Sequence, residues 1–242
     1  MERFTAGCPK PCGWTQNREG PFKMEVASQP RELPGEPTRS ASRWIAWTIL
    51  AITAIAGLFL RWGGYILVAH DPLPAHVDAA VVLQGSILGE RSRVAGAMGL
   101  LQRGVAARAL LSVPRRSYWD EPIPPAAHRF VERVYGRELA DRVDFCETGT
   151  EVNSTEDEAR DLSHCIQEHG WQTVAIVTSD YHTRRAGMIW AKILSMQAPS
   201  VHMWIDGVSD PEFQPRGWWR HRLFAKTWFL ESIKLILTVL TE

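Results

Sequence analysis

Val174-Ala-Ile-Val-Thr-Ser-Asp-Tyr-His-Thr-Arg-Arg-Ala186 is a short apolar run that passes through a polar turn into the start of a helix. This order is typical of a buried parallel strand, which carries the side chains that follow it to the carboxyl edge of an α/β sheet. Ligands of open α/β sheets bind at that edge. We therefore expect chemistry at Ser179, Asp180, His182 and Arg185, with helix capping by Ser179 or Asp180 as the simpler alternative.

Strand and helix patterns flank this stretch on both sides. Apolar runs predict further strands at 79–83, 109–113, 143–145 and 201–205. Helical spacing of apolar residues predicts helices at 91–102, 126–135, 155–168 and 218–240. The charges of Lys226, Glu231 and Lys234 disfavour a second membrane span for the last helix. We expect its apolar face to pack on the sheet, with the membrane surface as the alternative. The alternation predicts a Rossmann-like three-layer α/β sandwich with a mostly parallel sheet.

A hydrophobic segment precedes the predicted domain. Residues 44–60 contain no charged side chain, and the apolar character extends to residue 69. This length is enough for a membrane-spanning helix, and Arg43 and Arg61 can reach water from its two ends. We predict a transmembrane anchor at 44–69 in contact with the lipid bilayer. A buried globular helix and a cleaved signal peptide are the alternatives.

Basic residues predict the orientation of this anchor. Arg31, Arg39 and Arg43 precede it, together with four more Lys or Arg, and none lies between Arg61 and Arg91. By the positive-inside rule, the N-terminus stays in the cytoplasm and the domain lies outside a bacterial inner membrane. We assign 1–43 to a disordered cytoplasmic tail, 70–76 to a linker and 77–242 to the α/β domain.

Charge and cysteine content limit the function classes. The chain has 27 basic and 27 acidic residues, so nothing in its net charge favours nucleic-acid binding. Cys8 and Cys12 form at most half of a metal site, so we predict no metal and assign no cofactor. In an oxidising compartment Cys146 and Cys165 either form a disulfide or stay as buried thiols, and the sequence leaves both open.

Four motifs share their spacing with a known family. They are Leu83-Gln-Gly-Ser86, Arg93 followed by Ala97 and Gly104, Glu147 with Ser154-Thr-Glu-Asp-Glu-Ala159, and Val177-Thr-Ser179 followed by His182 and Arg185-Ala186. On these motifs residues 77–237 resemble the YdcF, SanA and ElyC family, whose domain is called domain of unknown function 218. The resemblance implies a role in the cell envelope. The chain departs from the family at Ser112-Val-Pro114, where relatives carry glycines that let an anion approach the backbone.

The resemblance and the strand order together imply a site for a small anionic ligand, phosphate-like, nucleotide-like or an envelope precursor. The expected ligand-binding residues are Gly85, Ser86, Arg93, Glu147, Thr155, Ser179 and Arg185. We expect Arg93 and Arg185 to bind the anion, with surface ion pairing as the alternative for each. The expected catalytic residues are His182, as acid or base, and Asp180, with Asp180 or Glu147 orienting the imidazole.

Three classes of function remain open at this point. The first is an envelope enzyme that uses His182, and the second is a binding or regulatory module without catalysis. The third, a soluble cytoplasmic nucleotide-binding enzyme, requires that residues 44–60 do not span a membrane. A serine hydrolase using Ser86 or Ser179 has less support, because the chain has no G-x-S-x-G elbow.

Overall fold

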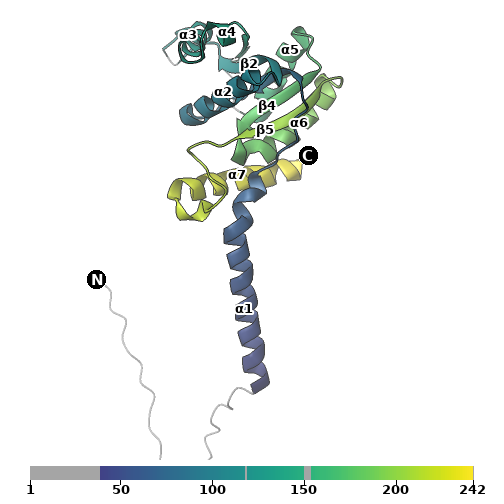
Figure 1. Cartoon of the computed structure of the whole chain (residues 1–242). Coiled ribbons are helices and arrows are strands. Elements are labelled where there is room, and N and C mark those ends of the chain that lie inside the picture. Colours follow the sequence, from purple (N-terminus) through teal and green to yellow (C-terminus); the bar gives the residue numbers. More distant parts are fainter. Residues whose placement is uncertain (1–38, 118, 150–153, 242) are drawn as a thin grey trace, which may run out of the picture. The chain divides into compact units, whose positions relative to one another are not determined.

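The computed structural model describes residues 39–117, 119–149 and 154–241 (Figure 1). Contacts divide the chain into two units, Met1–Trp47 and Thr48–Glu242, and the second contains the α/β fold. Its sheet is entirely parallel, with the order β3-β2-β1-β4-β5. The strands are β1 (Val77–Val82), β2 (Ala106–Pro114), β3 (Val143–Thr148), β4 (Thr173–Ser179) and β5 (His202–Val208). The predicted Rossmann-like α/β fold is confirmed.

Helices cover both faces of this sheet (Figure 1). One face packs against α2 (Ile87–Gln102), α3 (Ile123–Tyr135) and α4 (Arg137–Ala140), and the other against α5 (Thr155–Glu168) and α6 (Thr183–Gln197). The alternation of side chains along a strand explains the two cores. Ala80 and Val82 of β1 enter the first, while Ala79 and Val81 enter the second.

The order of the strands reverses between β1 and β4. After β1 the chain turns to α2 on one face, and after β4 it turns to α6 on the other. The two turns therefore separate at the carboxyl edge of neighbouring strands, which is where doubly wound sheets bind ligands. The stretch from Val174 to Ala186 lies at this position, as expected.

The hydrophobic segment forms α1 (Arg39–Trp62) and then the 3-10 helix η1 (Gly63–Leu67). Residues Ser42–Leu67 are long and apolar enough to cross a membrane, and no part of the tested window is buried. The end of the segment packs on the α/β unit. Leu67 is buried, and Thr183 Oγ1 accepts a hydrogen bond from the backbone N–H of Ala69. Residues 63–69 of the predicted anchor thus contact the domain.

Residues 70–76, predicted as a linker, also contact the sheet. The backbone N–H of Ile205 donates to Asp71 Oδ2 at 2.9 Å, so Asp71 caps part of the free edge of β5. Cys146 of β3 and Cys165 of α5 form a disulfide with a Cα separation of 6.1 Å. Of the two states left open for these cysteines, the structure has the disulfide. Cys8 and Cys12 lie outside the described residues.

The last helix, α7 (Arg222–Thr241), does not pack as predicted. It lies mainly against α6, η1, η2 (Asp180–His182) and η3 (Trp218–Arg220), because other helices already cover both faces of the sheet. Glu231 and Leu235 are its buried residues. Phe229, Ile233 and Leu240 are exposed, which fits the alternative of a helix at the membrane surface.

Candidate functional site

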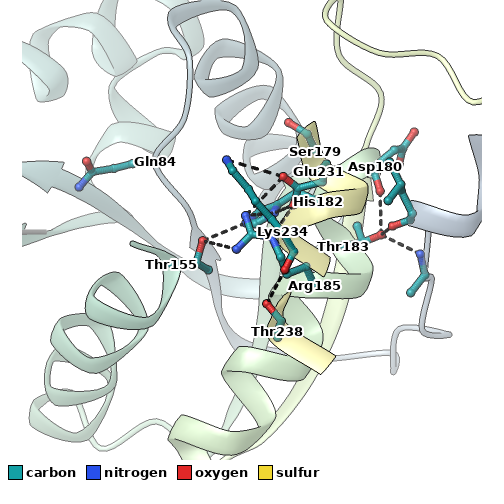
Figure 2. Close-up of polar contacts among 12 residues, drawn as sticks. Gln84, Thr155, Ser179, Asp180, His182, Thr183, Arg185, Glu231, Lys234 and Thr238 are labelled. Carbon is teal, nitrogen blue, oxygen red and sulfur yellow. Dashed lines mark hydrogen bonds and ion pairs between the residues drawn. The ribbon is translucent and has the colours of Figure 1, made fainter. Parts of the chain in front are cut away.

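His182 ends η2, directly after β4, and only 7% of its surface is exposed. Its Nδ1 lies 2.7 Å from Oε1 of Glu231 on α7, and its Nε2 lies 3.4 Å from Oγ1 of Thr155 at the start of α5 (Figure 2). A carboxylate, an imidazole and a hydroxyl from three separate elements thus contact one another in that order. This is the arrangement in which a histidine takes a proton from a hydroxyl group.

The charges of this group fix the histidine tautomer. Burial lowers the pKa of His182, and the nearby Arg185 charge adds to this effect, so the imidazole is neutral at pH 7. Burial alone would raise the pKa of Glu231, but the hydrogen bonds and charges of His182 and Arg185 bring it down to about 2. Nδ1 lies 2.7 Å from this carboxylate, which only accepts hydrogen bonds, and 3.2 Å from Arg185 Nη2, which only donates them. The shorter contact with the carboxylate places the proton on Nδ1. The lone pair of Nε2 then faces the Thr155 hydroxyl.

Arg185 and Lys234 add positive charge beside this group. Arg185 Nε donates to Glu231 Oε1 at 2.7 Å, Arg185 Nη1 donates to Thr155 Oγ1 at 3.4 Å, and Lys234 Nζ lies 3.9 Å from Glu231 Oε2. A cavity of about 350 Å³ opens here, lined by Thr155, Arg185, Lys234 and Thr238 among others. Glu156 also lines the cavity, but its carboxylate is paired with Arg160. Arg185 and Lys234 share the Glu231 carboxylate, so their positive charge favours the entry of a small anion.

Arg93 has a different role from the expected anion clamp. Its side chain is buried, and it donates to Ser179 Oγ at 3.0 Å, to the Leu83 carbonyl at 3.2 Å and to the Gln84 carbonyl. These bonds hold the ends of β1 and β4 together. A Cβ on Gly85 would lie 2.7 Å from Arg93 Nη1, so this glycine makes room for the guanidinium and not for a ligand.

Gln84 links three strands at the carboxyl edge of the sheet. Its Nε2 donates to Ser112 Oγ at 2.9 Å and to Thr148 Oγ1 at 2.8 Å, which links β1 to β2 and β3. Its backbone N–H donates to Glu158 Oε1 at 2.7 Å. Burial raises the pKa of Glu158 to about 7. Side-chain hydrogen bonds therefore occupy the carboxyl edge at these three strands.

Ser86 caps α2, since its Oγ accepts from Gly89 N at 3.1 Å, and it also donates to Glu212 Oε2 at 2.7 Å. Asp210 lies close by and is 2% exposed. Its Oδ1 accepts from Glu212 N at 2.8 Å, while its Oδ2 has no hydrogen-bond partner within the described part of the chain. No motif in the sequence pointed to Asp210 as a site residue.

Asp180 and Glu147 do not orient His182. The Asp180 carboxylate lies 3.8 Å from His70 Nε2, and Figure 2 shows it beside Thr183, away from the His182 group. Successive side chains of a 3-10 helix turn by about 120°, so Asp180 and His182 point in different directions. Glu147 forms an ion pair with Arg115 at 2.9 Å on an exposed part of the surface. Both expected roles are corrected by these positions.

Glu231 takes the role that was expected of Asp180 or Glu147. A signal for it was present in the sequence: it lies three residues after Trp228 and four before Leu235, on one face of the last helix. An acid on an apolar helix face requires a partner when it is buried. Sequence spacing alone, however, does not name that partner, since His182 is 49 residues away.

The described residues, with gaps at 118 and 150–153, contain no group of three or more His, Cys, Asp or Glu side chains placed to hold a metal ion. Comparison with known proteins finds no match: no family model, no curated protein and no solved structure is similar to this chain. The chemistry of the site is therefore argued from its own side chains, which are an imidazole, a carboxylate, a hydroxyl and two cations.

Proposed function

We propose that this chain is a single-pass, membrane-anchored protein of the bacterial cell envelope whose α/β domain binds a small anionic ligand outside the inner membrane and acts on it by acid/base chemistry. The observation that carries the proposal is the buried Glu231–His182–Thr155 contact beside the cavity of Arg185 and Lys234. The resemblance to the YdcF, SanA and ElyC family supports the envelope role.

Two features support the location. The helix Ser42–Leu67 is long and apolar enough to span a bilayer, and the basic residues before it favour a cytoplasmic N-terminus. The disulfide between Cys146 and Cys165 belongs in an oxidising compartment such as the periplasm.

In the proposed chemistry, Arg185 and Lys234 bind the anionic group of the ligand. The Nε2 atom of His182 accepts a proton from the Thr155 hydroxyl, or from a water in its place, while the oxygen attacks the ligand. Glu231 stabilises the imidazolium that forms. The bond between the attacked atom and the leaving group breaks, and the proton passes to the leaving group, so that His182 returns to its neutral state. When Thr155 is the attacking group, a water then releases the bound fragment from Thr155 by the same proton transfer.

The test begins with thermal unfolding of the full chain in detergent, with nucleotides and sugar phosphates as probes. A probe at 100 times its dissociation constant should add about 2.7 kcal/mol of stability. Lys234→Gln should weaken this effect, because it removes one of the two cations that bind the anion. The Lys234 side chain is 60% exposed, so the substitution should not disturb the core. Arg133→Gln on α3 is the matched control and should bind as the parent does. Equal binding by both variants would contradict the proposed site.

A non-catalytic binding module is the second candidate. Its support is that His182 is buried and that its Nε2 already faces Thr155, so access to the ligand is narrow. His182→Gln separates the two functions once a probe binds. A catalyst loses turnover of that probe and keeps its affinity, whereas a binding module shows no turnover in either form.

A further inference from the structure

A second and larger cavity lies where the end of α1 meets the segment before α7. Its volume is about 720 Å³. Its apolar wall includes Gly57, Leu60 and Phe224. The basic residues that line it are Arg61, Arg216, Arg220 and His221. None of these residues belongs to the His182 site, so the cavity requires its own explanation.

The walls of this cavity are held by aromatic packing. The Phe59 ring lies edge-on to Trp218 and Trp228, with centroid distances of 5.7 and 5.6 Å. Trp228 Nε1 donates to the Gly63 carbonyl at 2.9 Å, which joins α7 to the end of the anchor. All these residues belong to the unit Thr48–Glu242. The cavity is therefore a feature of one packed unit.

Among the described residues that line the cavity, none is an Asp or a Glu. Among the described residues, no ion pair includes Arg61, Arg216 or Arg220, although all three are exposed. Arg220 lies over the Trp219 ring at 5.1 Å. Guanidinium groups bind phosphate through paired N–H donors. Three of them around one cavity favour a phosphate-bearing ligand.

With α1 spanning the bilayer as proposed, the position of Arg61 along α1 would place this cavity at the membrane surface. Arg61 follows Ser42 by 19 residues, which is about 28 Å along a helix and close to the roughly 30 Å hydrocarbon core of a bilayer. Trp62 and Tyr65 are exposed next to it, and such aromatic residues favour the headgroup region. α7, which carries exposed apolar residues, contacts η1 at this same end of α1.

We propose that this cavity binds the phosphate headgroup of an anionic membrane lipid, with the acyl chains lying along α1 past Leu60 and Gly57. The combination of an apolar wall and a cationic wall at headgroup depth matches an amphiphile better than a soluble anion. The inference rests on α1 spanning the bilayer, which is part of the proposed function, but it does not depend on chemistry at His182.

The test uses the full chain in a mild detergent, offered phosphatidylglycerol and phosphatidylcholine, with bound lipids counted by native mass spectrometry. The parent should retain phosphatidylglycerol preferentially. The double variant Arg216→Gln/Arg220→Gln should lose about fivefold in retention for each arginine. Gly57→Leu keeps every cation but fills open space at the apolar wall, and it should also reduce retention. Arg129→Gln/Arg133→Gln on α3 is the matched control and should behave as the parent.

Equal retention by all four proteins would overturn the lipid site. Displacement of the lipid by millimolar glycerol phosphate would also overturn it, because the cavity would then accept a soluble phosphate. If the double arginine variant unfolds more easily than the parent, its loss of lipid is not informative, and the retention of phosphatidylglycerol by Gly57→Leu decides whether the cavity binds the lipid. Release of the parent chain from membranes by alkaline carbonate would contradict the anchor itself, and that result is distinguishable from failure of the cavity alone.

Discussion

Glu158 is a buried acid at the carboxyl edge of the sheet, 6% exposed, with Gln84 N as a hydrogen-bond donor. Burial raises its pKa from 4.5 to about 7, and the opposing effects of Gln84, Ser112 and Arg93 do not cancel this rise. Between these two pH values the folded protein holds a proton that the unfolded chain releases. The free energy of unfolding therefore falls as pH rises from about 4.5 to about 7.

Replacing Glu158 by Gln should remove this dependence on pH. Glutamine keeps an acceptor for Gln84 N without a charge to bury. The free energy of unfolding of the variant should therefore exceed that of the parent by about 3 kcal/mol at pH 8 and equal it near pH 4.5. Urea unfolding at both pH values measures the difference. Glu138→Gln on the exposed surface of α4 is the control. A constant difference between Glu158→Gln and parent across pH would show that Glu158 is not the titrating group.

Sequence reasoning located several residues correctly at this scale without giving their contacts. His182, Arg185 and Thr155 do come together. His182 and Arg185 follow the carboxyl end of β4 and Thr155 begins α5, and both places follow from the alternation of strands and helices. Arg93 was placed at the correct edge but given the wrong role. Its position on α2 is local information, whereas its carbonyl and hydroxyl partners arise from the packing of two strands.

The element η1 packs closely on the segment before α7. A Cβ on Gly64 would lie 2.2 Å from the carbonyl oxygen of Pro215, a contact that backbone atoms cannot relieve without moving apart. Gly57, seven residues earlier in α1, has nothing within 4 Å of the same position. The two glycines therefore provide a matched pair for testing how the end of α1 and η1 meet the rest of the domain.

Gly64→Ala should separate η1 from Pro215 and lower the free energy of unfolding by about 1–3 kcal/mol. Thermal unfolding followed by tryptophan fluorescence is suitable, since Trp218 and Trp228 lie at this contact. Gly57→Ala should be neutral or slightly stabilising, because alanine favours a helix. Similar behaviour of the two variants would show that the contact with Pro215 does not hold η1.

Strands and helices were the most predictable level of this structure. The apolar runs at 79–83, 109–113 and 201–205 all lie in or overlap observed strands, and the helix at 155–168 has the predicted bounds. The packing of α7 was predicted incorrectly because helical spacing shows that a helix has an apolar face but not which surface receives it. The faces of the sheet were occupied by helices earlier in the chain.

At the scale of the whole molecule, the disulfide tests the proposed topology. Cys146 and Cys165 enclose a loop of about 20 residues, so reduction or Cys146→Ser should cost about 3 kcal/mol. The assay uses a variant in which Cys8 and Cys12 are replaced by serine. In intact cells, Cys146 and Cys165 of this variant should resist alkylation until a reductant is added. A gel-shift assay with a large maleimide reports the number of free thiols. Full alkylation without reductant would place the domain in a reducing compartment.

The close contact of η1 with Pro215 and α7 holds the domain directly against the end of α1. Trp228 holds Gly63, and Gly64 lies against Pro215, so the chain has no slack at the point where the helix leaves the domain. A tethered domain searches a volume set by the length of its linker. A domain that is fixed to its helix does not explore such a volume, so a molecule that binds to it has to reach it by its own diffusion.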